Sequence, residues 1–139
     1  MNLIERNKEL MKKFETMINT ADVNLAEELV DEKASFYTPA SPEPLYGGQG
    51  YLSVVYWMRK SFSDIQWNIQ EMVADEQKVA VRWNMTGTHN GEFMGFKPTN
   101  KKISVCVMNF YYFNENGKVT NDIAAEGMIG IFRGIGAMP

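Results

Sequence analysis

Hydrophobic and polar residues follow a helical period in the first part of the chain and a strand period in the second. Between residues 2 and 19 the large apolar side chains recur three or four positions apart, with Glu and Lys between them, which predicts an amphipathic helix. A second, shorter helix follows a cap near Asp22 and ends near Lys33. A third helix is predicted over residues 51–61.

The segment between the second and third predicted helices, residues 36–50, is rich in residues that interrupt regular structure. It contains prolines at 39, 42 and 44 and glycines at 47, 48 and 50. Proline removes a backbone donor and fixes φ, and glycine favours turns, so this composition excludes a helix or a central strand. We expect an ordered connection over the surface.

After the third helix, apolar and polar residues alternate as they do in a half-buried strand. Strands over residues 65–73 and 79–86 are joined by the polar turn 75–78, and strands over residues 102–113 and 118–132 are joined by an Asn-Gly turn. Helices followed by two antiparallel hairpins predict an α+β fold. In this fold a curved antiparallel sheet wraps around three N-terminal helices.

The third predicted strand is apolar on both of its faces. Alternate residues form one set of Val105, Val107, Tyr111 and Phe113 and another of Cys106, Met108, Phe110 and Tyr112. The helices can cover one face, but the other must find a partner or remain an exposed apolar patch. A second copy of the chain is the simplest cover, so we expect a homodimer that associates through the outer face of the sheet. The alternative is a solvated face with scattered aromatic residues.

Length, composition and charge are those of one globular domain over residues 1–139. The apolar share of 45% and the aromatic share of 12% supply a core that a chain of this size can bury. A net charge of −3, without a basic cluster, argues against nucleic acid as a partner. The single cysteine, Cys106, permits no internal disulfide and no Cys-His metal site, and we expect it to be buried and inert. Without an apolar run of signal or membrane length, we expect a cytoplasmic protein that begins near Met1 and contacts no membrane.

His89, the single histidine of the chain, lies in a glycine-rich loop after the second predicted strand. Glycines at 87, 91 and 95 and a proline at 98 prevent that strand from continuing. An imidazole at the rim of an apolar sheet can titrate near neutral pH. It either holds the loop through a hydrogen bond, which is the role we favour, or moves a proton.

Four groups of residues occur in an order typical of a known family. They are Phe-Tyr-Thr-Pro at 36–39, Tyr-Gly-Gly at 46–48, Gly-Thr-His-x-Gly followed by Pro-Thr between 87 and 99, and Gly-Lys-Val at 117–119. Together with Arg-Trp at 82–83 and Gly-Ala at 136–137, these motifs make a match over nearly the whole chain, in which the sequence resembles the SnoaL-like polyketide cyclases and ester cyclases. The resemblance implies the nuclear transport factor 2-like fold, a cone-shaped α+β barrel that is usually dimeric and holds an apolar pocket. Relatives on this fold include enzymes, ligand-binding domains and scaffolds, so the fold alone leaves the function open.

The resemblance also implies a reaction, the intramolecular aldol condensation of a polyketide ester without metal or organic cofactor. The family's general acid or base is an Asp on the last strand, four residues after a Trp. Aligning the Gly-Lys-Val motif places Ile123 at the Trp position and Gly127 at the Asp position. Strand alternation points the neighbouring Glu126 away from the interior unless a bulge brings it in. The sequence therefore predicts a divergent site without the family carboxylate.

The remaining candidates for proton transfer are His89, Tyr37 and Asn109, each of which could instead satisfy buried polar neighbours. The expected walls of the pocket are apolar, aromatic or small: Trp57, Trp83, Met85, Tyr111, Ile123 and Gly127. Two interpretations follow. The first is a cyclase or isomerase that binds a small apolar carbonyl compound, and the second is a non-catalytic ligand-binding or scaffolding domain. We expect neither metal nor cofactor in either case.

Overall fold

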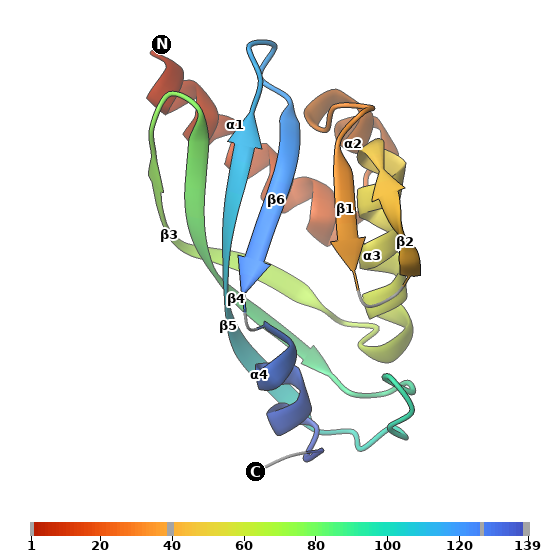
Figure 1. Cartoon of the computed structure of the whole chain (residues 1–139). Coiled ribbons are helices and arrows are strands. Elements are labelled where there is room, and N and C mark those ends of the chain that lie inside the picture. The colour runs from red at the N-terminus through yellow and green to blue at the C-terminus, as the bar shows by residue number, and fades with distance from the viewer. Residues whose placement is uncertain (1, 39–40, 126, 138–139) are drawn as a thin grey trace.

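The computed structural model describes residues 2–38, 41–125 and 127–137 of the chain. Helices come first and strands follow, as Figure 1 shows. In chain order the elements are α1 (Leu3–Thr20), α2 (Val23–Leu29), β1 (Ser35–Thr38), β2 (Ser41–Tyr46), α3 (Gly47–Ser61), β3 (Gln66–Ala74), β4 (Lys78–Thr88), β5 (Lys102–Phe113), β6 (Val119–Ala125) and α4 (Gly127–Gly134). In the described part of the chain, no helix is both long enough and apolar enough to span a membrane.

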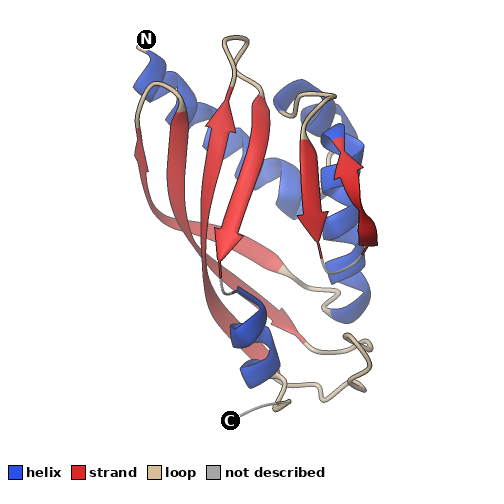
Figure 2. Ribbon diagram, viewed as in Figure 1, coloured by secondary structure: helices blue, strands red, loops and turns tan. Residues whose placement is uncertain are grey.

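The larger sheet is antiparallel throughout, with the strand order β3-β4-β5-β6. Figure 2 shows that this sheet is strongly curved, that α1 crosses behind it, and that α2, α3 and the β1-β2 hairpin stand beside it. The predicted α+β fold, with N-terminal helices followed by a curved antiparallel sheet, is confirmed.

The first two helices begin where the sequence supplies a cap. The Asn2 side chain accepts the backbone N–H of Glu5 at the start of α1, and Asp22 plays the same role at the start of α2. Both helices were predicted, although α2 ends at Leu29 rather than near Lys33.

The third helix, α3, begins at Gly47, before its predicted start at residue 51. Gly47 has a φ of 68°, which glycine adopts without strain, and this turns the chain from β2 into the helix. A Cβ on Gly48 would clash with the backbone carbonyl of Ala26 in α2, so glycine allows the two helices to approach closely. The predicted start is wrong because it relied on helix propensity, which glycine lowers. Packing against α2 places Gly47 and Gly48 in the first turn of α3 despite their low propensity.

The proline-rich segment forms the β1-β2 hairpin, in which Phe36 lies opposite Leu45. We expected an ordered surface connection over residues 36–50 that contains neither a helix nor a central strand, and the exclusion of a helix is wrong for residues 47–50, which belong to α3. The hairpin is separate from the four-stranded sheet, which agrees with the exclusion of a central strand.

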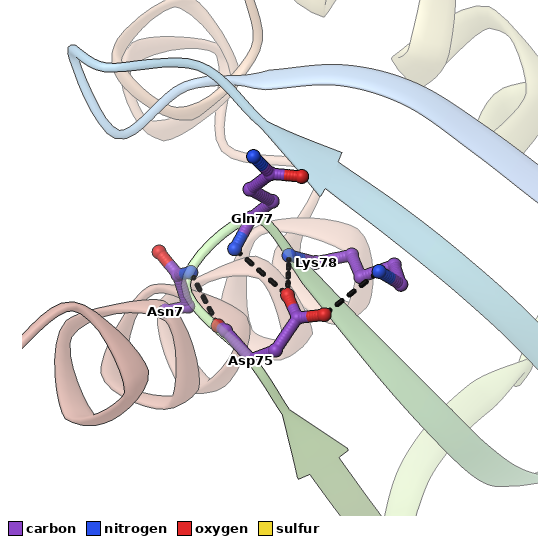
Figure 3. A network of polar contacts seen from close by, with 4 residues as sticks. All are labelled: Asn7, Asp75, Gln77 and Lys78. Atoms are coloured by element: carbon purple, nitrogen blue, oxygen red, sulfur yellow. Dashed lines mark hydrogen bonds and ion pairs between the residues drawn. The ribbon is translucent and has the colours of Figure 1, made fainter.

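A polar turn joins β3 to β4 and anchors α1 (Figure 3). The Asp75 carboxylate accepts the backbone N–H groups of Gln77 and Lys78, both at 2.8 Å, and forms an ion pair with the Lys78 ammonium group at 2.7 Å. The hydrogen bond from the Lys78 side chain, followed by these backbone hydrogen bonds, lowers the pKa of Asp75 to about 2. The buried Asn7 amide of α1 donates to the Asp75 carbonyl at 3.1 Å. This contact ties the first helix to the hairpin (Figure 3).

Among the described residues, the buried apolar side chains form two clusters. The first, here named the Tyr111 cluster, lies between the helices and the sheet and includes Phe14, Leu52, Val81, Trp83 and Tyr111. The second, the Phe93 cluster, gathers side chains from the end of α3, β4, the glycine-rich loop, β5 and α4, among them Met58, Phe62, Met85, Phe93, Val105 and Ile131.

The two faces of β5 alternate as predicted. Val105, Asn109 and Tyr111 are buried, whereas Met108 and Phe110 are exposed on the outer face. The expectation that Cys106 is buried is wrong. Cys106 shares the outer face with Met108 and is exposed.

The prediction of a strand that continues to Phe132 is wrong, because β6 ends at Ala125 and helix α4 begins at Gly127. Gly127 therefore does not lie on a strand that lines the interior. Further along α4, Gly130 lies directly over Val105, and a Cβ on Gly134 would be 2.6 Å from the Ile103 side chain. These glycines allow α4 to pack closely on β5.

A bulge near the start of β6 reverses the predicted direction of its side chains. Phe113 of β5 is opposite Val119, but the next β5 residue along, Tyr112, is opposite Asn121, so Thr120 is an extra residue. Beyond the bulge, Asp122 lies opposite the buried Tyr111, which places it on the inner face. Ile123, predicted to line the interior, lies opposite Phe110 on the outer face and is 53% exposed.

Candidate active site

Asp122 brings a carboxylate from β6 to the inner face of the sheet. Its Oδ1 accepts the Asn109 side-chain amide of β5 at 2.7 Å, and its Oδ2 accepts the Tyr51 hydroxyl of α3 at 3.0 Å. The hydroxyl of Tyr111 interacts with that of Tyr51 and accepts the indole N–H of Trp83 at 3.1 Å. These five side chains, here named the Asp122 network, connect α3 with β4, β5 and β6.

Burial dominates the ionisation of this network. It raises the pKa of Asp122 to about 6, while hydrogen bonds from Asn109 and Tyr51 lower that pKa and offset part of the rise. Burial, followed by the negative charge of Asp122, raises the pKa values of Tyr51 and Tyr111 well above their usual range. The phenols therefore remain neutral donors near pH 7, and the carboxyl group can exchange its proton there.

Aromatic packing fixes the hydroxyl groups of the network. The Tyr51 ring lies edge-on to Phe14 of α1 and Phe36 of β1, with ring centroids 5.0 Å apart in each pair. Tyr111 also packs against Phe14 at 5.0 Å, and both Tyr111 and Trp83 are 2% exposed. Close-packed rings hold their hydroxyl groups in one place, so the network is pre-organised around the carboxylate.

His89 is fully buried and packs on Phe62, a member of the Phe93 cluster. Its Nδ1 accepts the backbone N–H of Thr99 at 3.2 Å, across the glycine-rich loop, and its ring packs on Phe62 at 5.4 Å. Its Nε2 is buried and has no hydrogen-bond partner among the described residues. Trp83, the member of the network on β4, precedes His89 by six positions, roughly 20 Å of strand, and Val79, opposite Tyr111, precedes it by ten. The structure therefore does not bring His89 to the Asp122 network, and the contacts of His89 are those of a residue that holds the loop.

The other predicted site residues lie in several environments. Asn109 joins the Asp122 network, as do the predicted wall residues Trp83 and Tyr111. Met85 belongs to the Phe93 cluster, and Trp57 packs against it. The side chain of Tyr37 and the whole of Glu126 lie outside the described residues.

A surface hollow of about 620 Å³ lies between the end of α2, the start of α3 and the β5-β6 turn. Acidic and polar side chains dominate its lining, among them Glu27, Asp31, Glu32, Gln49 and Lys118. None of the predicted wall residues lines it. The apolar interior pocket expected from the sequence stays a prediction.

Comparison with known protein families identifies the family of this chain. The model of the family described as SnoaL-like polyketide cyclase matches residues 8–135, which is most of the chain. The chain belongs to the SnoaL-like family. No curated protein sequence matches closely enough to add to this assignment.

Solved structures agree with this SnoaL-like protein in fold. AclR from Streptomyces galilaeus is 24% identical with a TM-score of 0.80, and the alignment covers 98% of this chain and 88% of AclR. TsrD from Streptomyces laurentii is 17% identical with a TM-score of 0.83, covering 96% and 97%. A SnoaL-like polyketide cyclase from Agrobacterium tumefaciens is 17% identical with a TM-score of 0.74, covering 96% and 97%. At these identities the similarity shows a shared fold.

Reasoning from the sequence of this SnoaL-like protein missed two members of the network, Asp122 and Tyr51. Strand alternation counted forward from the Gly-Lys-Val motif places Ile123 inside and Asp122 on the outer face, and the bulge at Thr120 reverses that result. A signal for Asp122 was nevertheless present, since it is a carboxylate directly before the apolar stretch that starts at Ile123. Tyr51 had no such signal, because one tyrosine near the start of an amphipathic helix is ordinary.

Proposed function

We propose that this SnoaL-like protein is a cofactor-independent cyclase or isomerase of a small apolar carbonyl compound, with Asp122 as its general acid and base. The observation that carries the proposal is the carboxylate of Asp122, which is held on the inner face by two neutral donors and has a pKa of about 6. A base with this pKa is largely ionised at pH 7 and still basic enough to remove an activated proton. Asp122 would take the role of the carboxylate that the family places at the position of Gly127.

The network supports a complete proton cycle. The Asp122 carboxylate removes a proton from the carbon beside a carbonyl group, and Tyr51, a neutral donor, can hydrogen-bond the enolate oxygen that forms. In a cyclase, the enolate carbon then attacks a second carbonyl carbon of the same molecule, and Asp122 returns its proton to the new alkoxide oxygen. In an isomerase, Asp122 returns the proton to a different carbon. Neither cycle consumes an oxidant, a reductant or another co-reactant.

Exchange of α-protons with solvent tests the first step without knowledge of the natural substrate. We would incubate small cyclic ketones, β-diketones and lactones with the protein in D₂O and follow loss of the α-proton signal by NMR. Wild type should accelerate exchange of at least one compound. Asp122→Asn should lower the rate about 100-fold or more, because an amide cannot accept the proton.

Asp64→Asn is the matched control, since Asp64 is an exposed carboxylate that accepts hydrogen bonds from Thr88 at the far end of β4. This variant should exchange at the wild-type rate. If Asp122→Asn also exchanges at the wild-type rate, Asp122 is not the base. If apolar compounds quench tryptophan fluorescence but wild type exchanges none of their protons, the alternative of a non-catalytic ligand-binding domain is the better account.

We also propose that two copies of the chain associate through the outer face of the sheet. An apolar row crosses all four strands there, because Val73 is opposite Ala80, Ala80 is opposite Phe110, and Phe110 is opposite Ile123. Val73, Phe110 and Ile123 are 71%, 48% and 53% exposed, and Met108 beside them is 57% exposed. A continuous apolar band of this kind is unfavourable in water and marks an interface.

Light scattering at micromolar concentration tests this interface. Wild type should have the mass of a dimer, and Phe110→Glu should have the mass of a monomer, because it places a charge in the middle of the row. The control Thr86→Glu adds the same charge to the outer face near the other end of β4 and should stay dimeric. A monomeric wild type would contradict the proposal.

A further inference from the structure

The glycine-rich loop after β4 is anchored at its base and folded tightly at its tip. The backbone N–H groups of Asn90 and Gly91 both donate to the carbonyl of Ser61, at the end of α3, at 3.0 Å. Two backbone hydrogen bonds of 2.9 Å join Phe93 to Phe96 and close the tip as a tight turn. The side chains of the tip are therefore presented on a fixed backbone.

The tip exposes large apolar side chains to solvent. Met94 is 47% exposed and Phe96 is 42% exposed. A Cβ built on Gly95, between them, would have no other atom within 4 Å, so the tip projects from the surface. Helix α4 extends this apolar surface, because Phe96 packs on Phe132 with ring centroids 5.7 Å apart, and Ile129, one turn before Phe132, is 43% exposed. Met94, Phe96, Ile129 and Phe132 are here named the tip patch.

Lysines accompany the tip patch in a chain that is acidic overall. From the loop into the start of β5 the sequence contains Lys97, Lys101 and Lys102, with Glu92 as the acidic residue, whereas the net charge of the chain is −3. Lys97 and Lys101 are exposed and form no ion pair with any described residue. The Lys101 ammonium group lies beside Gly136, directly after α4. Two uncompensated positive charges therefore lie near an exposed apolar surface.

We propose that the tip patch and its lysines dock this protein on the surface of an anionic lipid membrane. The apolar side chains enter the boundary between headgroups and hydrocarbon, while Lys97 and Lys101 pair with anionic headgroups. A lipid surface fits this tip better than a protein partner does. A projecting turn with three exposed apolar side chains offers far less area than the roughly 800 Å² per partner that a stable protein interface buries.

This inference goes beyond the proposed function and does not depend on it. The expectation of no membrane contact rested on the absence of a spanning segment, which a peripheral contact does not require. Small apolar carbonyl compounds partition into lipid, so docking would bring the protein to a source of such compounds.

Sedimentation with lipid vesicles tests the docking surface in the intact protein. Vesicles of phosphatidylcholine with about one-third phosphatidylglycerol should bind wild type at low salt. Binding should fall about 10-fold or more when phosphatidylglycerol is left out or when the salt concentration is high. Met94→Ser and Lys97→Gln should each lower the partition coefficient about five-fold, because each removes one apolar or one charged contact with the membrane.

The matched controls are Leu3→Ser and Lys33→Gln, which change exposed residues of the same kinds away from the tip. Leu3 is 43% exposed and starts α1, at the opposite end of the molecule from α4 (Figure 1). Both controls should bind the vesicles as wild type does. Failure of wild type to bind the anionic vesicles, or equal losses in the test and control variants, would overturn the proposal.

Two further results would assign the tip patch to another occupant and overturn the proposal as well. Binding of wild type to poly-glutamate, without binding to vesicles, would point to an acidic protein partner. A smaller mass of Met94→Ser than of wild type in light scattering would point to a second copy of the chain.

Discussion

Asp122 in its network and His89 in the glycine-rich loop, here named the His89 loop, both lie in an aromatic interior, but their hydrogen bonds differ. Both oxygens of Asp122 accept hydrogen bonds from neutral donors on a helix and a strand. His89 bonds through one nitrogen to Thr99 of its own loop, and its other nitrogen has no partner among the described residues. The first arrangement keeps a group in place while its charge changes. The second arrangement holds the loop, because the hydrogen bond from Thr99 to Nδ1 joins its two ends.

The largest expected difference between the two regions is in catalysis. His89→Asn keeps a hydrogen-bond acceptor near the position of Nδ1, so its rate of α-proton exchange should stay within about three-fold of wild type. Asp122→Asn should lose about 100-fold or more in the same assay. Equal losses in the two variants would contradict the separation of a catalytic end from a structural end.

The next effect concerns the close packing of the His89 loop. A Cβ on Gly91 would clash with the carbonyl oxygen of Lys60 at the end of α3, so Gly91→Ala should lower the free energy of unfolding by about 3 kcal/mol. Gly95→Ala is the control, because Gly95 has a φ of 87° but open space around it, and its loss should be about 1 kcal/mol. Chemical denaturation measures both. A larger loss in Gly95→Ala would mean that backbone conformation, not packing, limits the loop.

At the Asp122 end, stability should depend on pH. Because the folded pKa of Asp122 is raised to about 6 from an ordinary 3.8, the folded state holds the proton more tightly than the unfolded state. Wild type should therefore lose stability relative to Asp122→Asn as the pH rises from about 4 through 6, by about 2 to 3 kcal/mol in total. Denaturation of both proteins at pH 4 and pH 8 measures this difference. A constant difference would mean that the carboxyl group is not desolvated.

The smallest effect is expected at Asp64, which joins the strand near His89 to the end of α3. Its carboxylate accepts the backbone N–H and the hydroxyl of Thr88, both at 2.7 Å, and these hydrogen bonds lower its pKa. Since the group is exposed, Asp64→Asn should lose less than about 1 kcal/mol at pH 7. The loss should disappear as the pH falls through the lowered pKa, opposite in sign to the effect at Asp122. A loss that persists in acid would point to packing instead of charge.

The alternation of apolar and polar residues was sufficient to predict the regular part of the fold. It identified α1, both hairpins of the large sheet and the inner faces of β4 and β5, because one buried face imposes a period on each element. For the same reason it placed Asn109, Trp83 and Tyr111 inside the fold, and these became members of the site.

Two features near the C-terminus could not be predicted in this way. The bulge at Thr120 leaves no mark in the pattern of apolar residues, yet it changes which side chains of β6 face inward. Helix α4 contains glycines at 127, 130 and 134, which disfavour a helix by propensity, and Gly130 and Gly134 allow it to pack closely on β5. Both features depend on contacts with β5, so the inward direction of Asp122 became visible only in three dimensions.

Titration of the aspartate carboxyl carbons by ¹³C NMR tests the role of Asp122 most directly. Selective ¹³C labelling of aspartate, with Asp122→Asn to assign the signal, gives the pKa of each carboxyl group in one experiment. The Asp122 signal should titrate with a midpoint near pH 6, while Asp75 at the β3-β4 turn should titrate near pH 2. An Asp122 midpoint near the ordinary value of 3.8 would mean that the carboxylate is solvated, and the proposed general acid and base would be wrong.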